Sequence, residues 1–155
     1  MSKQSAGILM FRRTSSGAIE FLLVHPGGPF WAKKDLGAWS IPKGEFSPEE
    51  DTLLAARREF CEETGSDAAG QFIELVPVKQ PGGKIVHAWA VEGAFDVRQL
   101  VSNRFELEWP PRSGRVHSYP EVDRAAWFDV ETAKAKILKG QVSLIDQLLQ
   151  HFGKN

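Results

Sequence analysis

Cysteine is scarce in this sequence of 155 residues, and there is no excess of charge and no long apolar run. The single cysteine, Cys61, excludes an intrachain disulfide and suits a reducing compartment. Nineteen basic side chains nearly balance twenty acidic ones, so the composition gives no sign of nonspecific binding to nucleic acid or to an acidic membrane surface. The apolar run Ala6–Phe11 is too short for a signal peptide, and no stretch approaches the roughly twenty apolar residues of a membrane span. We therefore expect a cytoplasmic protein with no nucleic-acid or membrane partner.

Other signals of special architecture are absent as well. The four histidines share no spacing typical of a zinc site, and the sequence contains no repeat, low-complexity segment or internal domain boundary. A chain of this length can bury a sizeable core within one domain. We expect a single domain over residues 1–155, as a monomer or a homodimer.

The stretch from Gly44 to Ser66 organises the rest of the sequence. Ser47 is a candidate N-cap, the next residue is a proline, and Glu50 follows at the spacing of a capping box. No glycine interrupts the segment until Gly65, a residue type that tolerates the left-handed conformation after a helix end. The pattern predicts a helix over Pro48–Glu63.

This helix carries acidic side chains next to an apolar stripe. The stripe, which we expect to face a core, contains Leu53, Ala56 and Phe60. Glu59, Glu62 and Glu63 lie on the adjacent face at spacings of three and four. A solvated acidic face is the ordinary explanation, but three converging carboxylates also supply the oxygen ligands that a hard cation such as Mg²⁺ prefers. The acids therefore make a candidate metal site.

The fixed residues of this stretch are Gly44, Glu50, Arg58, Glu59, Glu62, Glu63 and Gly65. Their order and spacing resemble the Nudix box of the Nudix hydrolases at all seven fixed positions. The family pattern ends with a bulky aliphatic residue where this chain has Ser66, a change that concerns the packing of a loop and not the acids. The resemblance implies an α+β fold, in which a mixed β-sheet is sandwiched between α-helices (α/β/α).

The resemblance also implies roles for the residues of the box. The metal ligands would be the backbone carbonyl of Gly44 and the side chains of Glu59, Glu62 and Glu63. They would hold Mg²⁺, for which Mn²⁺ could substitute. Arg58 would orient Glu59, and Glu50 would make a supporting contact or bind a further ion through water.

One glutamate is expected to act as the general base that accepts a proton from the attacking water. Family members differ in which glutamate does so, and some take it from a later loop. In this chain the later candidates are Glu108 and Glu121. The alternative for both is a solvated surface acid.

Side chains outside the box could contact a nucleotide substrate. Lys43, directly before Gly44, could hold a phosphate, and Lys33 could meet a polyphosphate chain from its loop. Trp31 and Tyr119 lie in or beside loops where a purine could stack. The alternatives are plain surface positions for the two lysines and packing for the two aromatic residues.

Strand-like runs precede and follow the box helix. The expected strands are Ala6–Phe11, Ile19–Val24, Phe72–Lys79, Lys84–Val91, Phe105–Trp109 and Ala125–Phe128. A loop over His25–Gly37 leads towards the box, and the turn Pro81–Gly83 predicts a hairpin between the strands on either side. Asp129 is expected to cap a helix, which a final amphipathic helix follows. We expect Trp39 and Trp89 in the core.

The resemblance implies hydrolysis of a pyrophosphate linkage in a nucleoside diphosphate joined to another group. The short chain and the segments Trp39–Gly44 and Trp127–Phe128 favour nucleoside triphosphates or dinucleoside polyphosphates such as diadenosine tetraphosphate. Pro81 favours an ADP-ribose or nucleotide-sugar pyrophosphatase, although a hairpin turn explains it equally well. Alternatives of another class are a noncatalytic nucleotide sensor and an interaction module, against which the complete set of box carboxylates argues.

Overall fold

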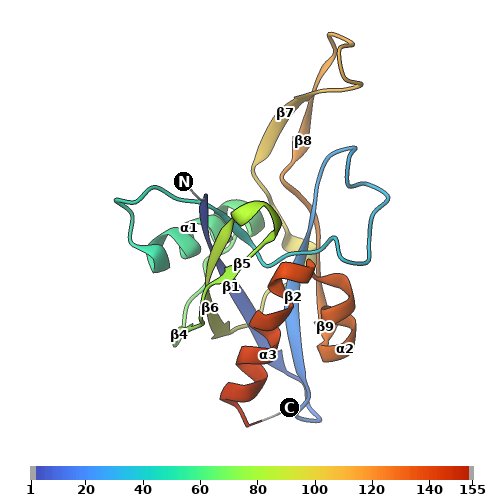
Figure 1. Cartoon of the computed structure of the whole chain (residues 1–155). Helices are drawn as coiled ribbons and strands as arrows, with labels where there is room; N and C mark the ends of the chain where they lie inside the picture. Colours follow the sequence, from blue (N-terminus) through green and yellow to red (C-terminus); the bar gives the residue numbers. More distant parts are fainter. Residues whose placement is uncertain (1–2, 154–155) are drawn as a thin grey trace.

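The structure is a computed structural model, and it describes residues 3–153 as a sheet with helices on both faces (Figure 1). The strands are β1 (Gln4–Arg13), β2 (Ile19–Pro26), β3 (Lys43–Glu45), β4 (Ile73–Glu74), β5 (Val78–Lys79), β6 (Ile85–Glu92), β7 (Arg104–Glu108), β8 (Val116–Pro120) and β9 (Val122–Asp129). The α-helices are α1 (Thr52–Thr64), α2 (Val130–Lys136) and α3 (Val142–His151), and the 3₁₀ turns are η1 (Pro81–Gly83), η2 (Val97–Gln99) and η3 (Lys139–Gln141). None of the helices within residues 3–153 is long and apolar enough to cross a membrane.

Strand β1 lies at the centre of the main sheet, whose path runs β4-β6-β1-β2-β9. β1 pairs in parallel with β6 and antiparallel with β2 and β3, so the sheet is mixed, as the sequence predicts. Because β6 occupies one side of β1, β2 and β3 share the other side. β3 pairs with β1 at its start, with Ser5 opposite Glu45, and β2 pairs with it at its end, with Phe11 opposite Phe21.

Neighbouring residues of β1 point to opposite faces of the sheet and enter two separate cores. Leu9 and Phe11 belong to the core that contains the buried side of α3. Ile8 and Met10 belong to the core that contains the buried side of α1. Figure 1 shows α1 on one side of the sheet and α2 and α3 on the other. The α/β/α arrangement expected from the sequence is therefore confirmed.

Helix α1 begins later than the sequence predicts. Its N-cap is Asp51, whose carboxylate accepts a hydrogen bond from the backbone N–H of Leu54 at 3.0 Å, and not Ser47. Glu50 still reaches back to the backbone N–H of Ser47 at 3.4 Å, which is half of the predicted capping box, but these residues form a turn before the helix. The helix ends as expected, at Gly65 with φ = 80°.

The predicted strand over Phe72–Lys79 is in fact two short strands, β4 and β5, separated by residues 75–77. Both pair antiparallel with β6, which confirms the predicted hairpin. Trp39 and Trp89 are buried, as expected. Pro81 opens the 3₁₀ turn η1 between the strands of the hairpin.

A second, two-stranded sheet projects from the body of the protein (Figure 1). It consists of β7 and β8, with Phe105 opposite Tyr119 in the register, and we call this hairpin, residues 104–120, the arm. The sequence predicts only the first of these strands. The five residues of β8 alternate little in polarity, and their pairing depends on β7 alone.

Replacement of Asp51 by Ala should lower the free energy of unfolding by about 1 kcal/mol, because the N-terminus of α1 loses its side-chain acceptor. Ser47→Ala is the matched control and should change it by less than about 0.3 kcal/mol, because Ser47 lies before the helix. Urea unfolding of the two variants measures both values. The reverse order would place the N-cap at Ser47.

Candidate active site

The site begins where β3 meets α1. Gly44 lies in β3 directly against the carboxylate of Glu59, and a Cβ atom at position 44 would overlap that carboxylate. Glycine is therefore required by close approach and not by an unusual backbone angle. Glu59 is only 8% exposed, so β3 covers one side of the acid. The first residue of the box and the acid Glu59 are thus packed as a unit.

Arg58 connects three of the box acids. Its Nη1 donates to Glu59 Oε2 at 2.6 Å and to Glu62 Oε2 at 3.2 Å. Its Nε and Nη2 donate to the two carboxylate oxygens of Glu50 at 3.1 and 3.2 Å, a paired geometry that fixes the plane of the guanidinium group. The arginine therefore orients Glu59, Glu62 and Glu50 together.

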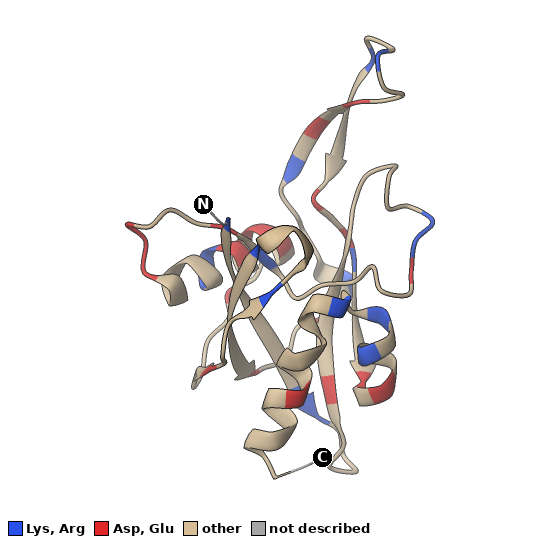
Figure 2. Cartoon of the chain, in the orientation of Figure 1, with Lys and Arg blue, Asp and Glu red and all other residues tan. Residues whose placement is uncertain are grey.

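Glu59 and Glu63 hold protons more tightly than exposed carboxylates do. Burial, followed by the charge of Glu62, raises the pKa of Glu59 to about 7 despite its contact with Arg58. Burial raises the pKa of Glu63 to about 8, although the backbone N–H of Lys43 donates to its Oε1 at 3.2 Å. Burial also lowers the pKa of the Lys43 ammonium group. The negative charge of the acids in the C-terminal half of α1 is therefore incompletely compensated. Figure 2 shows acidic residues of this helix in red.

Residues 3–153 contain no group of three His, Cys, Asp or Glu side chains that is already arranged to hold a metal ion. Arg58 lies between Glu59 and Glu62, and Glu63 turns towards the backbone of Lys43. The assignment of ligands among the box acids and the Gly44 carbonyl therefore stays a prediction. The donor chemistry fits a divalent cation, because the oxygens are hard ligands and the buried acids lack a full countercharge.

A pocket of about 360 Å³ opens beside these acids. Glu63 and Lys43 line it from the box, and Lys84 lines it from the end of the β5–β6 turn. Trp31 and Glu121 line it as well. The pocket therefore combines carboxylates, two amino groups and an aromatic ring, which suits a phosphorylated ligand with a ring at one end.

Of the site residues predicted outside the box, some line this pocket and others do not. Glu121, Trp31 and Lys43 line the pocket with Glu63. Glu108 lies in the arm, where its carboxylate accepts hydrogen bonds from the backbone N–H groups of Arg112 and Gly114 at 3.0 and 3.2 Å, so it is not brought to the box acids.

Two further predicted contacts lie away from the lining of this pocket. Lys33 is exposed in the loop after β2. Tyr119 packs in the arm, with its ring centroid 6.0 Å from that of Phe105. Their predicted substrate contacts stay untested.

Two buried polar residues, His25 and Gln141, fix segments that line the pocket, and the sequence pattern does not predict this role. His25 is fully buried, with Nδ1 2.8 Å from Asp123 Oδ1 and Nε2 2.6 Å from the carbonyl oxygen of Lys34. Gln141 accepts a hydrogen bond from the backbone N–H of Ile41 at 3.0 Å and donates to Ser40 Oγ at 3.0 Å. The contacts of His25 with Asp123 and of Gln141 with Ser40 and Ile41 join segments about a hundred residues apart, so no local pattern could have shown them.

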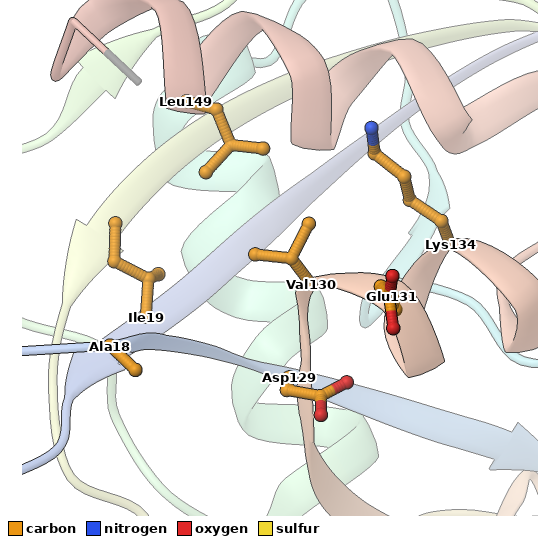
Figure 3. A pocket seen from close by; sticks show the side chains of 7 residues that line it. All are labelled: Ala18, Ile19, Asp129, Val130, Glu131, Lys134 and Leu149. Carbon is orange, nitrogen blue, oxygen red and sulfur yellow. The ribbon is translucent and has the colours of Figure 1, made fainter. Parts of the chain in front are cut away.

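A larger hollow, of about 490 Å³, lies elsewhere on the molecule (Figure 3). Ile19, Val130 and Leu149 form its apolar part, and Glu131 and Lys134 stand at its edge. None of its lining residues belongs to the box or adjoins it. Size alone therefore does not locate the active site.

Comparison with known proteins agrees with the geometry of the box. The family model for the NUDIX domain matches residues 1–148. The chain belongs to the Nudix family. Nudix hydrolases generally use divalent metal ions, which agrees with the oxygen-rich end of α1.

The relatives of this Nudix chain include asymmetrical bis(5'-nucleosyl)-tetraphosphatases. The enzyme of Sus scrofa is 37% identical over 73 residues, which cover 44% of this chain and 46% of the relative. The enzyme of Mus musculus is 33% identical over 103 residues, which cover 59% of this chain and 66% of the relative. The matches thus span less than two thirds of the relatives' length.

Solved structures share the fold over almost the whole chain. An Ap4A hydrolase of C. elegans, in a binary complex, has a TM-score of 0.65 at 24% identity, and the match covers 97% of this chain and 98% of that chain. The NUDIX domain of NrtR from Shewanella oneidensis, in complex with ADP ribose, has a TM-score of 0.67 at 14% identity and covers 98% and 89%. At these identities the likeness establishes the Nudix fold.

The raised pKa values predict how stability changes with pH in the absence of metal. In the folded protein the pKa of Glu63 is about 8, above its ordinary value of 4.5, so folding favours the protonated acid and loses stability as the pH rises through this interval. In EDTA, the free energy of unfolding should fall by about 1–2 kcal/mol between pH 6 and pH 7.5. Denaturant unfolding at several pH values measures this slope.

Glu63→Gln should reduce the slope, because glutamine keeps an acceptor for the Lys43 backbone N–H and does not titrate. A divalent cation should reduce the slope in the wild type, because it favours the ionised acids. Equal slopes in the wild type and the variant would mean that Glu63 is not protonated in the folded state.

Proposed function

We propose that this protein hydrolyses a pyrophosphate linkage in a nucleoside polyphosphate, with Mg²⁺ as its metal and Mn²⁺ as a possible replacement. The preferred substrates are nucleoside triphosphates or dinucleoside polyphosphates of the diadenosine tetraphosphate type. The observation that carries the proposal is the group of box acids bridged by Arg58, beside a pocket that Glu63, Lys43 and Lys84 line. We further propose that residues 1–155 form one catalytic domain that acts in the cytoplasm.

The reaction requires attack by water on a phosphorus atom of the anhydride. The water oxygen forms a bond to phosphorus, the bond from phosphorus to the bridging oxygen breaks, and the leaving phosphate departs with that oxygen. A divalent cation supplies charge neutralisation on the phosphate oxygens and acidifies water. Arg58 keeps Glu59 and Glu62 in place, and Lys43 and Lys84 stand where they can bind the phosphate chain.

Of the two later acids, Glu121 is our candidate for the general base. It lines the same pocket as Glu63, whereas Glu108 is engaged with the backbone of the arm. Burial, followed by the charge of Glu62, raises the pKa of Glu121, which makes it a stronger base. Glu59 and Glu63 stay alternatives, because their pKa values are raised as well.

The choice of substrate class is supported by the tetraphosphatases among the relatives. Pro81 offers no support for an ADP-ribose pyrophosphatase, because it begins the 3₁₀ turn of a hairpin in which Gly82 has φ = 86° and Gly83 has φ = 84°. A hairpin turn is therefore a sufficient reason for the proline. The noncatalytic sensor is disfavoured by a box that keeps every acid.

A substrate panel tests the proposal. Magnesium-dependent release of phosphate or nucleotide is measured with diadenosine tetraphosphate, ADP-ribose and nucleoside triphosphates. Fastest release from diadenosine tetraphosphate or a triphosphate is expected. Fastest release from ADP-ribose would support the alternative enzyme, and tight binding of a nucleotide without hydrolysis would support the sensor.

Glu62→Gln and Glu63→Gln should each lower turnover of the best substrate by about 100-fold or more, with folding intact, because each removes a negative ligand without a change in volume. Steady-state kinetics and a thermal melt measure the two effects. Glu108→Gln is the matched control and should leave turnover within about twofold. Near-normal activity in both box variants would remove these acids from the metal site.

A further inference from the structure

A second hollow continues from the pocket beside the box acids. It is a groove of about 320 Å³ between the arm and the loop that follows β2. The pocket and the groove share Pro26, Trp31 and Glu121 in their linings, so they meet at these residues. The groove therefore leads from the site of the proposed chemistry outwards along the arm, which Figure 1 shows beside the long loop between β2 and β3.

The lining of the groove is mostly apolar and includes three aromatic side chains. Phe105 and Leu107, two residues apart in β7, point to the same face of the arm and line one wall. Phe30 and Trp31 line the other, with their ring centroids 5.4 Å apart. Gly28 lies between the walls, where a Cβ atom would stand 3.1 Å from the ring of Phe105.

The loop and the arm are fixed to each other at the inner end of the groove. The backbone N–H of Gly27 donates to the carbonyl oxygen of Glu121 at 2.9 Å, and the N–H of Glu121 donates to the carbonyl oxygen of Asn103 at 2.8 Å. A Cβ atom at Gly27 would overlap the carbonyl of Pro120 at the end of the arm. These contacts anchor the loop to the end of the arm beside Glu121, which lines both the groove and the pocket.

The charge of the groove differs from that of the pocket. Among the described residues that line the groove none is basic, and the one charged side chain is Glu121. Lys34 is not one of the lining residues, and it places its Nζ over the rings of Phe30 and Trp31, at 4.0 and 5.0 Å from the two centroids. A phosphate is therefore disfavoured in the groove, whereas a flat uncharged ring could stack on its aromatic walls.

We propose that this groove binds one nucleobase of a dinucleoside polyphosphate, whose bridging phosphates pass Glu121 to reach the box acids. The proposal rests on the proposed function for the identity of the substrate, but its geometry is independent of the chemical step. It assigns the arm to substrate selection: a ligand with a second nucleoside gains the stacking contacts of Phe105 and Trp31, and a ligand without one does not.

Two substrates that differ only in the second nucleoside test this assignment. The kcat/KM of the protein is measured with diadenosine tetraphosphate and with adenosine 5′-tetraphosphate, and the ratio of the two values reports the second base. Phe105→Ala should lower this ratio by about tenfold, through KM, because stacking of a base on an aromatic ring is worth about 1–3 kcal/mol.

Two control variants separate stacking from damage to the arm. Phe105→Tyr keeps the ring and should preserve the ratio. Val116→Ala changes a residue of the arm that is 60% exposed and outside the lining of the groove, and it should also preserve the ratio. An unchanged ratio in Phe105→Ala, or an equal loss with both substrates, would overturn the proposal while leaving the proposed function intact.

The proposal stays testable if the wild type hydrolyses neither compound, an outcome that would contradict the dinucleoside polyphosphate part of the proposed function. Calorimetry on the unreacted mixtures then gives the two dissociation constants directly. The groove assignment requires about tenfold tighter binding of diadenosine tetraphosphate, and loss of that difference in Phe105→Ala. Equal affinities, or no binding of either compound, would overturn it.

Discussion

Burial of neighbouring carboxylates on α1, together with their mutual repulsion, is the constraint on which the site depends. Glu59 and Glu63 are withdrawn from solvent, and each has a raised pKa because burial and neighbouring acids disfavour its charge. Arg58 offsets part of this repulsion by contacts with three acids at once. One guanidinium group cannot balance all of them, so the folded protein presents carboxylates whose charge a divalent cation would neutralise.

The fold holds these like charges together by means that are not electrostatic. Helix α1 packs its apolar side on the sheet through Ala55, Ala56 and Phe60, and β3 presses Gly44 against Glu59. β3 can do so because β6 already occupies the other side of β1, so that β2 and β3 divide one side between them. Hydrophobic burial on both faces of the sheet thus stabilises the fold and offsets the unfavourable free energy of burying the acids.

Access to the acids is shaped by segments that are distant in the sequence. His25 and Gln141 are buried polar residues whose hydrogen bonds fix the loop after β2 and the segment before β3. Gly27 meets the end of the arm at Glu121, which lies between the pocket and the groove. The same contacts that hold the arm in place therefore define where a substrate could extend from the box.

The sequence by itself determined the box, its helix and the layered fold, because these depend on local spacing: the apolar stripe, Gly65 at the helix end and the apolar runs of β1, β2 and β6. It placed the N-cap wrongly, since Ser47 and Asp51 are both good cap residue types and the structure begins the helix after Asp51. Tertiary structure alone decided that Glu121 and not Glu108 joins Glu63, and that β8 pairs with β7 to form the arm. These outcomes depend on contacts between residues tens of positions apart, which a pattern read along the chain does not contain.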